Sequence, residues 1–502
     1  MNYFLNENIF TLNSGTEFSA LKRLELFKAH GIPAKILTRN YSSQLRGDAG
    51  RVGLLQTDVM NMYDFFQETV EVPEADIDVR YAEAIDKNTY HIEGIDANRS
   101  VVRHAGKVIA EVQIAPATVG IVGSIDYYND LMGISAKDIW DRRGFKSSTQ
   151  YFHPDGTPGA QLFFDRTGKP RLEIARMNVN GQVLPSMYKV LDYKGKSWQF
   201  DSEDQLFVFF LNELAAREDA VFINDRPSLA PAFSMVQGAR GKWQFLHATH
   251  AANGAPKQVA PYMKPIFDSL AVHFDGVLVP TEAQQADIYA LGSKFKNVLV
   301  VPDTFSEVDK PVSADKRTPD KLVYLGRMAD DKNTSEVIKI FAKIHQKRPN
   351  ARLKFLGYAS PADSQQKIEE LATKEKVRDF IEFAGYVNPA VYKAELESAA
   401  LALSTSVGEA FGMTVLDALS AGVPVVAYDV KYGLREQIEN GVNGALVQLG
   451  ASQKAADAAL AILDDLAHYS TGAYEKAKTF DADNAWEKWQ AAHAFAGNLF
   501  VD

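Results

Sequence analysis

Residues 401–426 read LALSTSVGEAFGMTVLDALSAGVPVV. Two short apolar runs, Leu401–Ser404 and Val423–Ala427, have the length of buried strands, and the residues between them read as a loop followed by a helix. Gly408 and Gly412 allow the backbone of this loop to approach a ligand closely. Because the first N–H groups of a helix have no partner within it, the loop suits a phosphate or a sugar oxygen. The stretch therefore predicts a ligand site at the carboxyl end of a strand.

The same alternation of strand and helix extends over residues 321–470. One expected helix carries Val337, Ile340, Phe341 and Ile344 at helical spacing. The expected strands are Leu322–Leu325, Leu353–Leu356, Ile381–Phe383, Leu401–Ser404, Val423–Ala427 and Ala445–Val447. Strands that alternate with helices form a parallel sheet, so this region predicts a doubly wound, Rossmann-like sheet.

The first three hundred residues contain a second α/β pattern that is interrupted. Residues 1–70 read as strand, glycine turn, helix and strand, and buried strands resume after residue 206. In between, alternating strand patterns are separated by turns whose glycines are 12, 13 and 14 residues apart, namely Gly156, Gly168, Gly181 and Gly195. Asp-Gly and Asn-Gly are typical of hairpin turns, so we expect an antiparallel β-meander inserted into an α/β domain. A separate all-β domain is the alternative.

A linker rich in Asp, Lys, Ser and Pro follows Pro302 and ends near Asp320, and we place a domain boundary there. The chain is thus expected to hold two Rossmann-like domains that face one cleft. The expected segments are 1–74 and 206–310 for the N-terminal domain, 75–205 for the insertion, 311–480 for the C-terminal domain and 481–502 for a C-terminal helix.

Composition narrows the classes of function. The chain has 502 residues and no Cys, which excludes disulfide scaffolds, thiolate nucleophiles and Cys-ligated metals. Its net charge of −10 argues against a protein that mainly coats nucleic acid. Met1–Phe10 lacks the pattern of a signal peptide, and the most apolar stretch, Leu206–Leu214, is too short to span a membrane. We therefore expect a cytoplasmic protein.

Charged residues follow two of the predicted C-terminal strands. Arg327 and Lys332 lie between the first strand and the next helix, where two cations can clamp a pyrophosphate. Glu409 and Asp417 lie eight positions apart, so one can reach a sugar and the other a ribose. The alternatives are two solvated loop cations, and a polar cap with an acid on the helix surface. Because both loops belong to the carboxyl edge of one sheet, we expect them to share a ligand.

Two histidines and a glycine turn supply further candidates. His247 and His250 follow the buried strand Trp243–Leu246, where a histidine can contact a sugar hydroxyl. A structural pair and a metal site are the alternatives, although no third ligand and no His-Glu-x-x-His pattern accompanies them. The first βα turn, Ser14-Gly15-Thr16, can present N–H groups to a phosphate.

Two Asp-x-Asp triplets, Asp76-Ile77-Asp78 and Asp481-Ala482-Asp483, match the pattern of some metal-dependent enzymes. Neither follows a buried parallel strand, so we interpret both as chance occurrences and expect no metal.

Together with Ala421-Gly422-Val423-Pro424-Val425-Val426, the cation and acid loops resemble the retaining glycosyltransferases of family 4, which have the GT-B fold. The resemblance implies that Arg327 and Lys332 bind the diphosphate of a nucleotide sugar, that Glu409 contacts the donor sugar, and that Asp417 contacts the ribose. The family has Glu at the last position, where Asp417 is one methylene shorter. The implied reaction needs no metal and retains the anomeric configuration.

Further stretches narrow the resemblance to one subgroup over nearly the whole chain. They are Ser14-Gly15-Thr16-Glu17, the meander, His247-Ala248-Thr249-His250 and Tyr428-Asp429-Val430-Lys431-Tyr432-Gly433. The subgroup holds bacterial wall-teichoic-acid α-glycosyltransferases and accessory-secretion O-GlcNAc transferases of serine-rich adhesins. The resemblance implies that His247 contacts the donor sugar and that Gly385 and Tyr386 flank the nucleotide base. Other residues of the donor site are then Ser14, Gly15, Thr16, Gly326, Ala410, Phe411 and Gly412.

The resemblance also implies the partners. The donor is UDP-GlcNAc or UDP-glucose, and the acceptor is teichoic acid or a serine-rich protein; the sequence separates neither pair. A polyanionic acceptor would need cations, which the insertion supplies as Arg166, Lys169, Arg171, Arg176, Lys189, Lys194 and Lys196. The insertion is implied to bind acceptor or to mediate assembly, as a homo-oligomer or with a related protein. We expect no cofactor and no nucleic acid. We also expect the protein to associate with the inner face of the membrane.

A different hypothesis is a catalytically silent GT-B partner or chaperone that binds a glycosylated protein. Such a protein would be free to lose the residues that bind the donor. The presence of Arg327, Lys332, His247 and Glu409 favours the enzyme.

Overall fold

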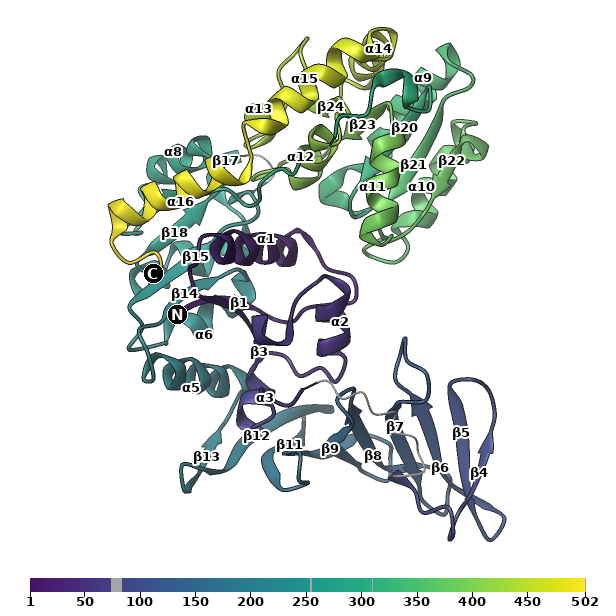
Figure 1. The fold of residues 1–502 in the computed structure, drawn as a ribbon, viewed down its shortest axis with the longest axis vertical. Helices are drawn as coiled ribbons and strands as arrows, with labels where there is room; N and C mark the ends of the chain where they lie inside the picture. The colour runs from purple at the N-terminus through teal and green to yellow at the C-terminus, as the bar shows by residue number, and fades with distance from the viewer. Residues whose placement is uncertain (74–83, 253–254, 309, 502) are drawn as a thin grey trace. The chain divides into compact units, whose positions relative to one another are not determined.

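The computed structural model describes residues 1–73, 84–252, 255–308 and 310–501 (Figure 1). The Asp76-Ile77-Asp78 triplet and the expected boundary between residues 74 and 75 lie outside the described residues. The chain divides into two compact units. The first holds Met1–Asn13, Ile32–Arg240 and Val501–Asp502, and the second holds Ser14–Gly31 and Gly241–Phe500.

The first unit contains parallel strands in the order β14-β1-β2-β3. Their bounds are Asn2–Asn6 for β1, Ala34–Thr38 for β2, Val59–Asn61 for β3 and Val221–Asn224 for β14. The helices of this unit are α2 (Leu45–Arg51), α3 (Met62–Phe66), α5 (Glu203–Ala215) and α6 (Ala230–Ser234). Phe4, Phe207 and Phe222 are completely buried and belong to its core. The predicted first βαβ pattern is therefore present as parallel strands.

The insertion is an antiparallel sheet whose ten strands lie in sequence order, from β4 to β13 (Figure 1). Their bounds are His91–Gly94, Arg99–His104, Lys107–Ile114, Val122–Tyr128, Ile134–Asp141, Phe145–Phe152, Pro158–Phe164, Pro170–Val179, Gln182–Tyr193 and Lys196–Phe200. The predicted meander is thus confirmed. Its four predicted turn glycines all have positive φ, between 73° and 87°, a conformation that glycine adopts without steric cost.

A buried ion cluster joins the insertion to α3 within the first unit. Arg143, whose side chain is 1% exposed, donates to both carboxylate oxygens of Asp141 and to Asp64, each at 2.8 Å. Arg46 donates to the other oxygen of Asp64 at 2.9 Å. Since a buried charge without a partner is costly, these mutual bonds hold the insertion against the α/β strands of its unit.

The second unit begins with parallel strands in the order β19-β18-β15. They span Gly241–Phe245 (β15), Gly276–Val279 (β18) and Val298–Val300 (β19), and α1 (Gly15–Ala29), α7 (Lys264–Phe267), α8 (Glu282–Ala290) and α16 (Ala482–Ala496) accompany them. A short hairpin of β16 (Ala251–Ala252) and β17 (Ala255–Val259) follows β15. The predicted C-terminal helix is α16, whose Trp486 and Trp489 meet the ring of Phe27 edge-on at 5.5 and 5.3 Å.

A six-stranded parallel sheet forms the rest of this unit, in the order β22-β21-β20-β23-β24-β25. Its strands are β20 (Lys321–Leu325), β21 (Arg352–Leu356), β22 (Ile381–Phe383), β23 (Leu401–Ser404), β24 (Val425–Tyr428) and β25 (Gly444–Val447). Its helices are α9 (Thr334–Lys347), α10 (Ser364–Lys374), α11 (Pro389–Ser398), α12 (Met413–Ser420), α13 (Leu434–Gln437), α14 (Ser452–Asp464) and α15 (Leu466–Lys478). The predicted doubly wound sheet is confirmed.

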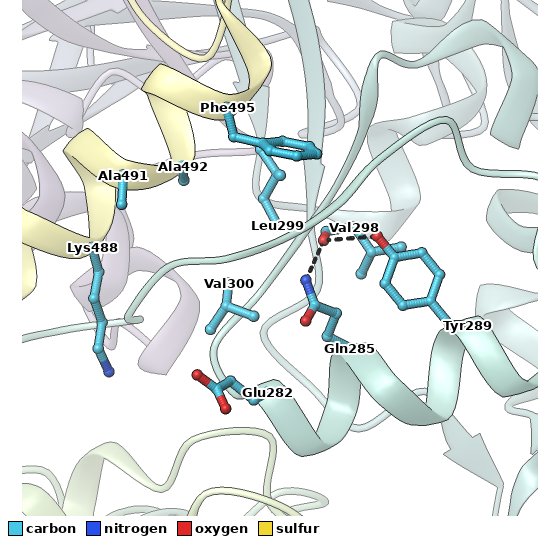
Figure 2. Close-up of a pocket in the computed structure, with 10 residues that line it drawn as sticks. All are labelled: Glu282, Gln285, Tyr289, Val298, Leu299, Val300, Lys488, Ala491, Ala492 and Phe495. Atoms are coloured by element: carbon cyan, nitrogen blue, oxygen red, sulfur yellow. Dashed lines mark hydrogen bonds between the residues drawn. The ribbon is translucent and has the colours of Figure 1, made fainter.

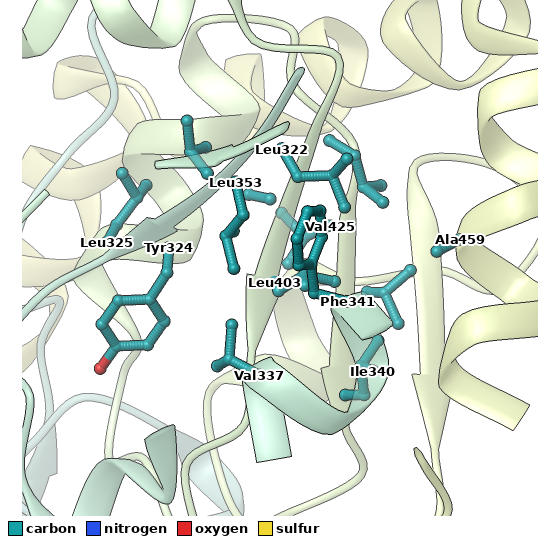
Figure 3. Packing of buried hydrophobic residues seen from close by; sticks show 14 of the residues in the cluster. Leu322, Tyr324, Leu325, Val337, Ile340, Phe341, Leu353, Leu403, Val425 and Ala459 are labelled. Atoms are coloured by element: carbon teal, nitrogen blue, oxygen red, sulfur yellow. The ribbon is translucent and has the colours of Figure 1, made fainter. Parts of the chain in front are cut away.

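The core of this sheet matches the predicted helical spacing. Val337, Ile340, Phe341 and Ile344 of α9 are all buried and pack against Leu322, Leu353, Leu403 and other strand residues (Figure 3). Strand β24 begins at Val425, two residues later than expected, because Pro424 has no N–H for the sheet. Within the described part of the chain, no helix has both the length and the apolar character needed to cross a membrane.

Candidate functional site

Three glycines form a row at the carboxyl edge of the six-stranded sheet. Gly326 N–H donates to the Leu356 carbonyl, and Gly357 N–H donates to the Gly385 carbonyl, both at 2.9 Å. A Cβ on Gly357 would lie only 1.9 Å from the Gly326 carbonyl oxygen. The ends of β20, β21 and β22 therefore meet so closely that only glycine fits at residue 357. Sequence reasoning named Gly326 and Gly385 but missed Gly357, although it follows a strand as the other two do.

The predicted cations extend from the loop after β20. Arg327 Nη2 lies 3.2 Å from both carboxylate oxygens of Asp331, and its side chain is 38% exposed. Lys332 ends a short 3-10 turn, and Asn333 then adopts a left-handed conformation (φ 49°) before α9 begins. This turn directs Lys332 toward the loop after β23, where its Nζ donates to Oε1 of Glu409.

The two loops are also joined through their backbones. Thr405 Oγ1 donates to the Lys332 carbonyl at 2.9 Å, and Val407 N–H donates to the Asp331 carbonyl at 3.1 Å. The Glu409 carboxylate accepts a second bond, from Ser406 Oγ, at 2.7 Å. The structure thus brings the predicted Lys332 and Glu409 into direct contact and fixes both carboxylate and ammonium in place.

Of the predicted Ala410, Phe411 and Gly412, the first two can offer only their backbone to a ligand, because their side chains are buried at 1% and 3% exposure. Gly412 has φ 93° and precedes α12, and a Cβ there would lie 2.7 Å from Leu434 Cδ2. Glycine is therefore required where the loop turns into the helix. The N-terminal N–H groups of α12 follow directly, and these groups have no partner within a helix.

Asp417 lies one turn into α12, where Tyr392 of α11 donates its hydroxyl to Oδ2 at 3.0 Å. The residue as a whole is exposed to solvent, while the protein packed near its carboxylate desolvates that group. This desolvation raises the pKa of Asp417 to about 6, and the Tyr392 hydroxyl opposes the shift. Asp417 therefore keeps its proton to a higher pH than an ordinary aspartate does.

Tyr386 follows the glycine row and is 36% exposed, with its ring centroid 6.2 Å from that of Tyr358. Gly385 has φ 70° and open space around its α-carbon. The two residues predicted to flank a base therefore present an accessible aromatic face beside an uncrowded backbone.

The two predicted histidines have different surroundings. His247, just after β15, stacks on Phe245 at 4.2 Å, and its Nδ1 lies 2.5 Å from Oδ1 of the buried Asp303. Ser19 Oγ donates to the Asp303 carbonyl at 2.7 Å and lies 3.3 Å from Oδ1. His250 is completely buried and packs parallel to Tyr432 at 5.7 Å. Sequence reasoning missed Asp303 and Ser19.

The start of α1 is a capping box. Both the N–H and the hydroxyl of Ser14 donate to Glu17 Oε2 at 2.7 Å, so the hydroxyl serves the helix. A Cβ on the exposed Gly15 would lie 3.5 Å from Met413 Sδ, which places the α1 start beside the α12 start. Thr16 is half-buried in the same turn.

Among the residues that the structure describes, no three His, Asp or Glu side chains are grouped as metal ligands. In the second predicted triplet, Asp481 caps α16 by accepting from the N–H of Asn484 at 2.9 Å. A cavity of about 290 Å³ lies between α8, β19 and α16, where Gln285 and Tyr289 both donate to the Val298 carbonyl (Figure 2). None of the predicted site residues lines it.

Comparison with protein families gives two matches. Residues 305–478 match the family described as glycosyl transferases group 1, and this range includes Arg327, Lys332, Glu409 and Asp417. Residues 10–217 match a family described as an accessory Sec system protein.

Three curated relatives resemble the chain. A UDP-N-acetylglucosamine–peptide N-acetylglucosaminyltransferase GtfA subunit of Streptococcus agalactiae is 23% identical over 89% of this chain and 87% of its own. A poly(ribitol-phosphate) alpha-N-acetylglucosaminyltransferase of Staphylococcus aureus is 24% identical over 95% and 96%. A poly(glycerol-phosphate) alpha-glucosyltransferase of Bacillus subtilis is 26% identical over 59% of this chain, which spans 43% of that protein.

Solved structures share the fold over the whole chain. The pneumococcal O-GlcNAc transferase GtfA in complex with UDP and GlcNAc has a TM-score of 0.83 at 19% identity, covering 99% of this chain and 98% of its own. TarM has a TM-score of 0.79 at 20% identity, covering 98% of both chains. The fold is therefore GT-B with an antiparallel insertion, as predicted. The chain carries a glycosyltransferase domain of group 1, which confirms the resemblance drawn from the sequence.

Two further structures of this fold are assemblies. A GtfA/B complex matches with a TM-score of 0.73 at 18% identity over 99% of both chains. A complex of accessory secretory proteins 1, 2 and 3 of Streptococcus pneumoniae matches with a TM-score of 0.69 at 18% identity over 99% of this chain and all of the matched one. Proteins of this fold thus occur in complexes with other chains.

Proposed function

We propose that this chain is a retaining glycosyltransferase that moves GlcNAc or glucose from a UDP-sugar to hydroxyls of a cell-surface acceptor. The observation that carries the proposal is the contact between Lys332 and Glu409, with Arg327 on the same loop, at the carboxyl edge of a parallel sheet. Such an edge, where helices begin, is where sheets of this kind bind nucleotides. The family match and the relatives named above support the same class.

In the proposed reaction the bond between the anomeric carbon and the diphosphate breaks, and an acceptor hydroxyl oxygen forms a bond to that carbon from the same face. The hydroxyl proton passes to the departing diphosphate. Negative charge develops on the departing diphosphate, so nearby cations stabilise the transition state. Arg327 offers a fork of donors, and Lys332 offers a point charge that Glu409 already orients. Glu409 positions the sugar and is not a covalent nucleophile.

We assign the remaining predicted site residues to successive parts of the UDP-sugar. The backbone of 410–412 and the first turns of α12 and α1, where Ser14, Gly15 and Thr16 lie, are assigned to the diphosphate and sugar. Asp417 is assigned to the ribose, and Gly385 and Tyr386 to the base. His247, oriented by Asp303, is assigned to a sugar hydroxyl. No metal and no cofactor is required by this scheme.

Both acceptors remain in the proposal, teichoic acid and Ser/Thr of a serine-rich protein. Several cations of the insertion already have acidic partners in the structure. Lys169 pairs with Asp192 at 2.6 Å and Arg171 with Asp165 at 3.0 Å. These ion pairs neutralise part of the basic run, so its charge alone does not select a polyanionic acceptor.

For the insertion, we propose bounds of 75–205 and a role in acceptor binding or in assembly, either with a second copy or with a related protein. The complexes formed by proteins of the same fold support assembly. The remaining proposed bounds are 1–74 and 206–310, 311–480, and 481–502. We place the enzyme in the cytoplasm or at the inner face of the membrane, where UDP-sugars are available.

A catalytically silent partner is the second candidate. The match of residues 10–217 to an accessory Sec protein, and the shared fold with the accessory secretory complex, favour it. The ion pair of Lys332 with Glu409 favours the enzyme, since a silent protein has no need to keep it.

The test incubates the purified chain with UDP-GlcNAc or UDP-glucose and with ribitol-phosphate polymer or a Ser/Thr-rich peptide. Released UDP and the mass of the product are measured for each of the four pairs. One pair is expected to give a product heavier by one sugar. Absence of turnover with every pair would leave the silent partner as the better description.

A further inference from the structure

The backbone of Glu409 is clamped by a second segment, residues 431–433. Glu409 N–H donates to the Lys431 carbonyl at 3.0 Å, and the Glu409 carbonyl accepts from the N–H groups of Tyr432 at 2.5 Å and Gly433 at 3.2 Å. A Cβ on Gly433 would lie 2.0 Å from the Phe411 carbonyl oxygen. The segment therefore lies directly against the Glu409 loop, and a shift of one moves the other.

This segment is in turn anchored on the part of the chain that carries His247. Lys431 Nζ donates to Oδ2 of Asp287, on α8, at 2.7 Å. The Tyr432 ring is 1% exposed and packs parallel to His250, and the Lys431 ammonium lies 5.8 Å from the centre of that ring. The ion pair thus ties Lys431 to α8, and ring packing ties Tyr432 to His250 in the loop that follows β15.

The Glu409 loop also touches the same region directly. A Cβ on Gly408 would lie 3.1 Å from Thr249 Cγ2, so the loop has no spare room on that side. Thr249 is two residues from His247. Asp287 and Lys431 are separated by 144 residues, and their contact sets the distance between the segments that carry His247 and Glu409.

From these contacts we infer that Lys431 and Asp287 are positioning residues, which hold Glu409 in register with His247 while neither touches the donor. The inference rests on the proposed function for its kinetic consequence. The side chains are 38% and 22% exposed, so the pair adds little to global stability. A small displacement of a reacting group can nevertheless cost roughly tenfold to a hundredfold in rate.

The kinetic test compares Lys431→Met with wild type. The kcat is expected to fall about tenfold or more, while the KM for the UDP-sugar changes about threefold or less, because Arg327 and the residues assigned to the ribose and the base lie outside the clamped loop. Asp287→Asn should lower kcat to the same extent. The double variant Lys431→Met/Asp287→Asn should have a kcat no lower than that of either single variant. Lys431→Arg, which keeps the positive charge, should keep most of the wild-type kcat. A wild-type kcat in Lys431→Met overturns the inference.

The matched control is Arg435→Met, which breaks the ion pair of Arg435 with Asp429 at 2.6 Å. That pair lies on the same stretch of chain and is more exposed, at 49% and 43%, but it does not reach α8. Its variant should keep the wild-type kcat and lose no more thermal stability than Lys431→Met does. Equal kinetic losses in both variants would show a general effect of ion-pair loss and overturn the positioning role.

A second measurement does not need turnover. Amide hydrogen exchange of residues 408–412 is expected to rise in Lys431→Met and to stay unchanged in Arg435→Met, because the Glu409 N–H is bonded to the anchored segment. If the wild-type protein transfers no sugar, the proposed function is wrong. The exchange measurement still tests whether residues 431–433 hold the Glu409 loop. Unchanged exchange in Lys431→Met would overturn the clamp whatever the activity.

Discussion

The imidazole of His247 donates through Nδ1 to Oδ1 of Asp303 at 2.5 Å, and the two side chains are only 10% and 3% exposed. A carboxylate in this place fixes the ring orientation and favours the tautomer, or the protonated form, that carries a proton on Nδ1. The other ring nitrogen of His247, Nε2, therefore points away from Asp303. The relationship makes Asp303 part of the candidate donor site through its hold on His247.

Replacing Asp303 by Asn should therefore lower kcat. Hydrogen bonds to charged groups contribute about 1.5–3 kcal/mol, which corresponds to roughly tenfold to a hundredfold in rate if expressed in the transition state. Steady-state kinetics with the best donor and acceptor measure the loss. Ser19→Ala, which removes a neighbouring hydroxyl but keeps the carboxylate, should cost less. Equal rates for Asp303→Asn and wild type would exclude the orienting role.

Replacing Lys332 by Ala should abolish transfer while leaving the fold intact. The change removes a charge proposed to stabilise the leaving diphosphate, and it leaves the Glu409 carboxylate without its ammonium partner. Because the pair is partly exposed to solvent, its loss should destabilise the protein by only about 1 kcal/mol. Product formation and a circular dichroism melt separate the two effects. Full activity in this variant would refute the diphosphate role.

The carboxyl edge of the C-terminal sheet was predictable because buried parallel strands read as continuous apolar runs. Once Leu322–Leu325 and Leu401–Ser404 are placed in one parallel sheet, the loops that follow them must lie on the same side. The pairing of β20 with β23 then brings the two loops together, whereas the ion pair of Lys332 with Glu409 depends on side-chain conformations that the sequence pattern does not give.

Other contacts carry no local signal. Asp303 meets His247 across 56 residues, and Lys431 meets Asp287 across 144, so no periodicity or spacing points to either pair. Ser14 is a different case. The Ser-x-x-Glu pattern of a capping box is readable in the sequence, and it predicts that the Glu17 carboxylate accepts from the Ser14 N–H, as the structure shows.

If Asp417 contacts the ribose as proposed, UDP-sugar binding should depend on pH. Its pKa is raised to about 6 by desolvation, so the carboxylate is ionised above that pH and protonated below it. Ribose hydroxyls donate to the ionised form, so UDP-sugar affinity should weaken as pH falls from 7 to 5. Calorimetric titration with a UDP-sugar measures this, since its diphosphate diester does not titrate in that range. An Asp417→Asn variant should bind more weakly at pH 7 and lose the pH dependence.

The same shift has a consequence for stability. A carboxyl whose pKa is higher in the folded state than its ordinary value of 3.8 favours folding when protonated, and this contribution is lost as pH rises through about 6. Asp417→Asn removes the unfavourable ionised group, so its melting temperature at pH 7.5 should exceed that of wild type. At pH 4 the two should melt at similar temperatures. A lower melting temperature for the variant at pH 7.5 would contradict the desolvation of Asp417.

Gly357 should tolerate no side chain. A Cβ there would lie 1.9 Å from the Gly326 carbonyl oxygen, and its φ of 155° lies outside the range that other residues prefer. Overpacking and backbone strain together should make Gly357→Ala less stable by about 2–5 kcal/mol, measured by urea unfolding. Gly326 precedes Arg327, so any relaxation that admits the methyl group should also displace the cation loop and weaken UDP-sugar binding. The matched control is Gly50→Ala, because Gly50 lies in helix α2 and has open space around its α-carbon. This variant should have the stability of wild type or exceed it by up to about 1 kcal/mol. Equal stability of Gly357→Ala and Gly50→Ala would mean that the glycine row is not required for the edge of the sheet.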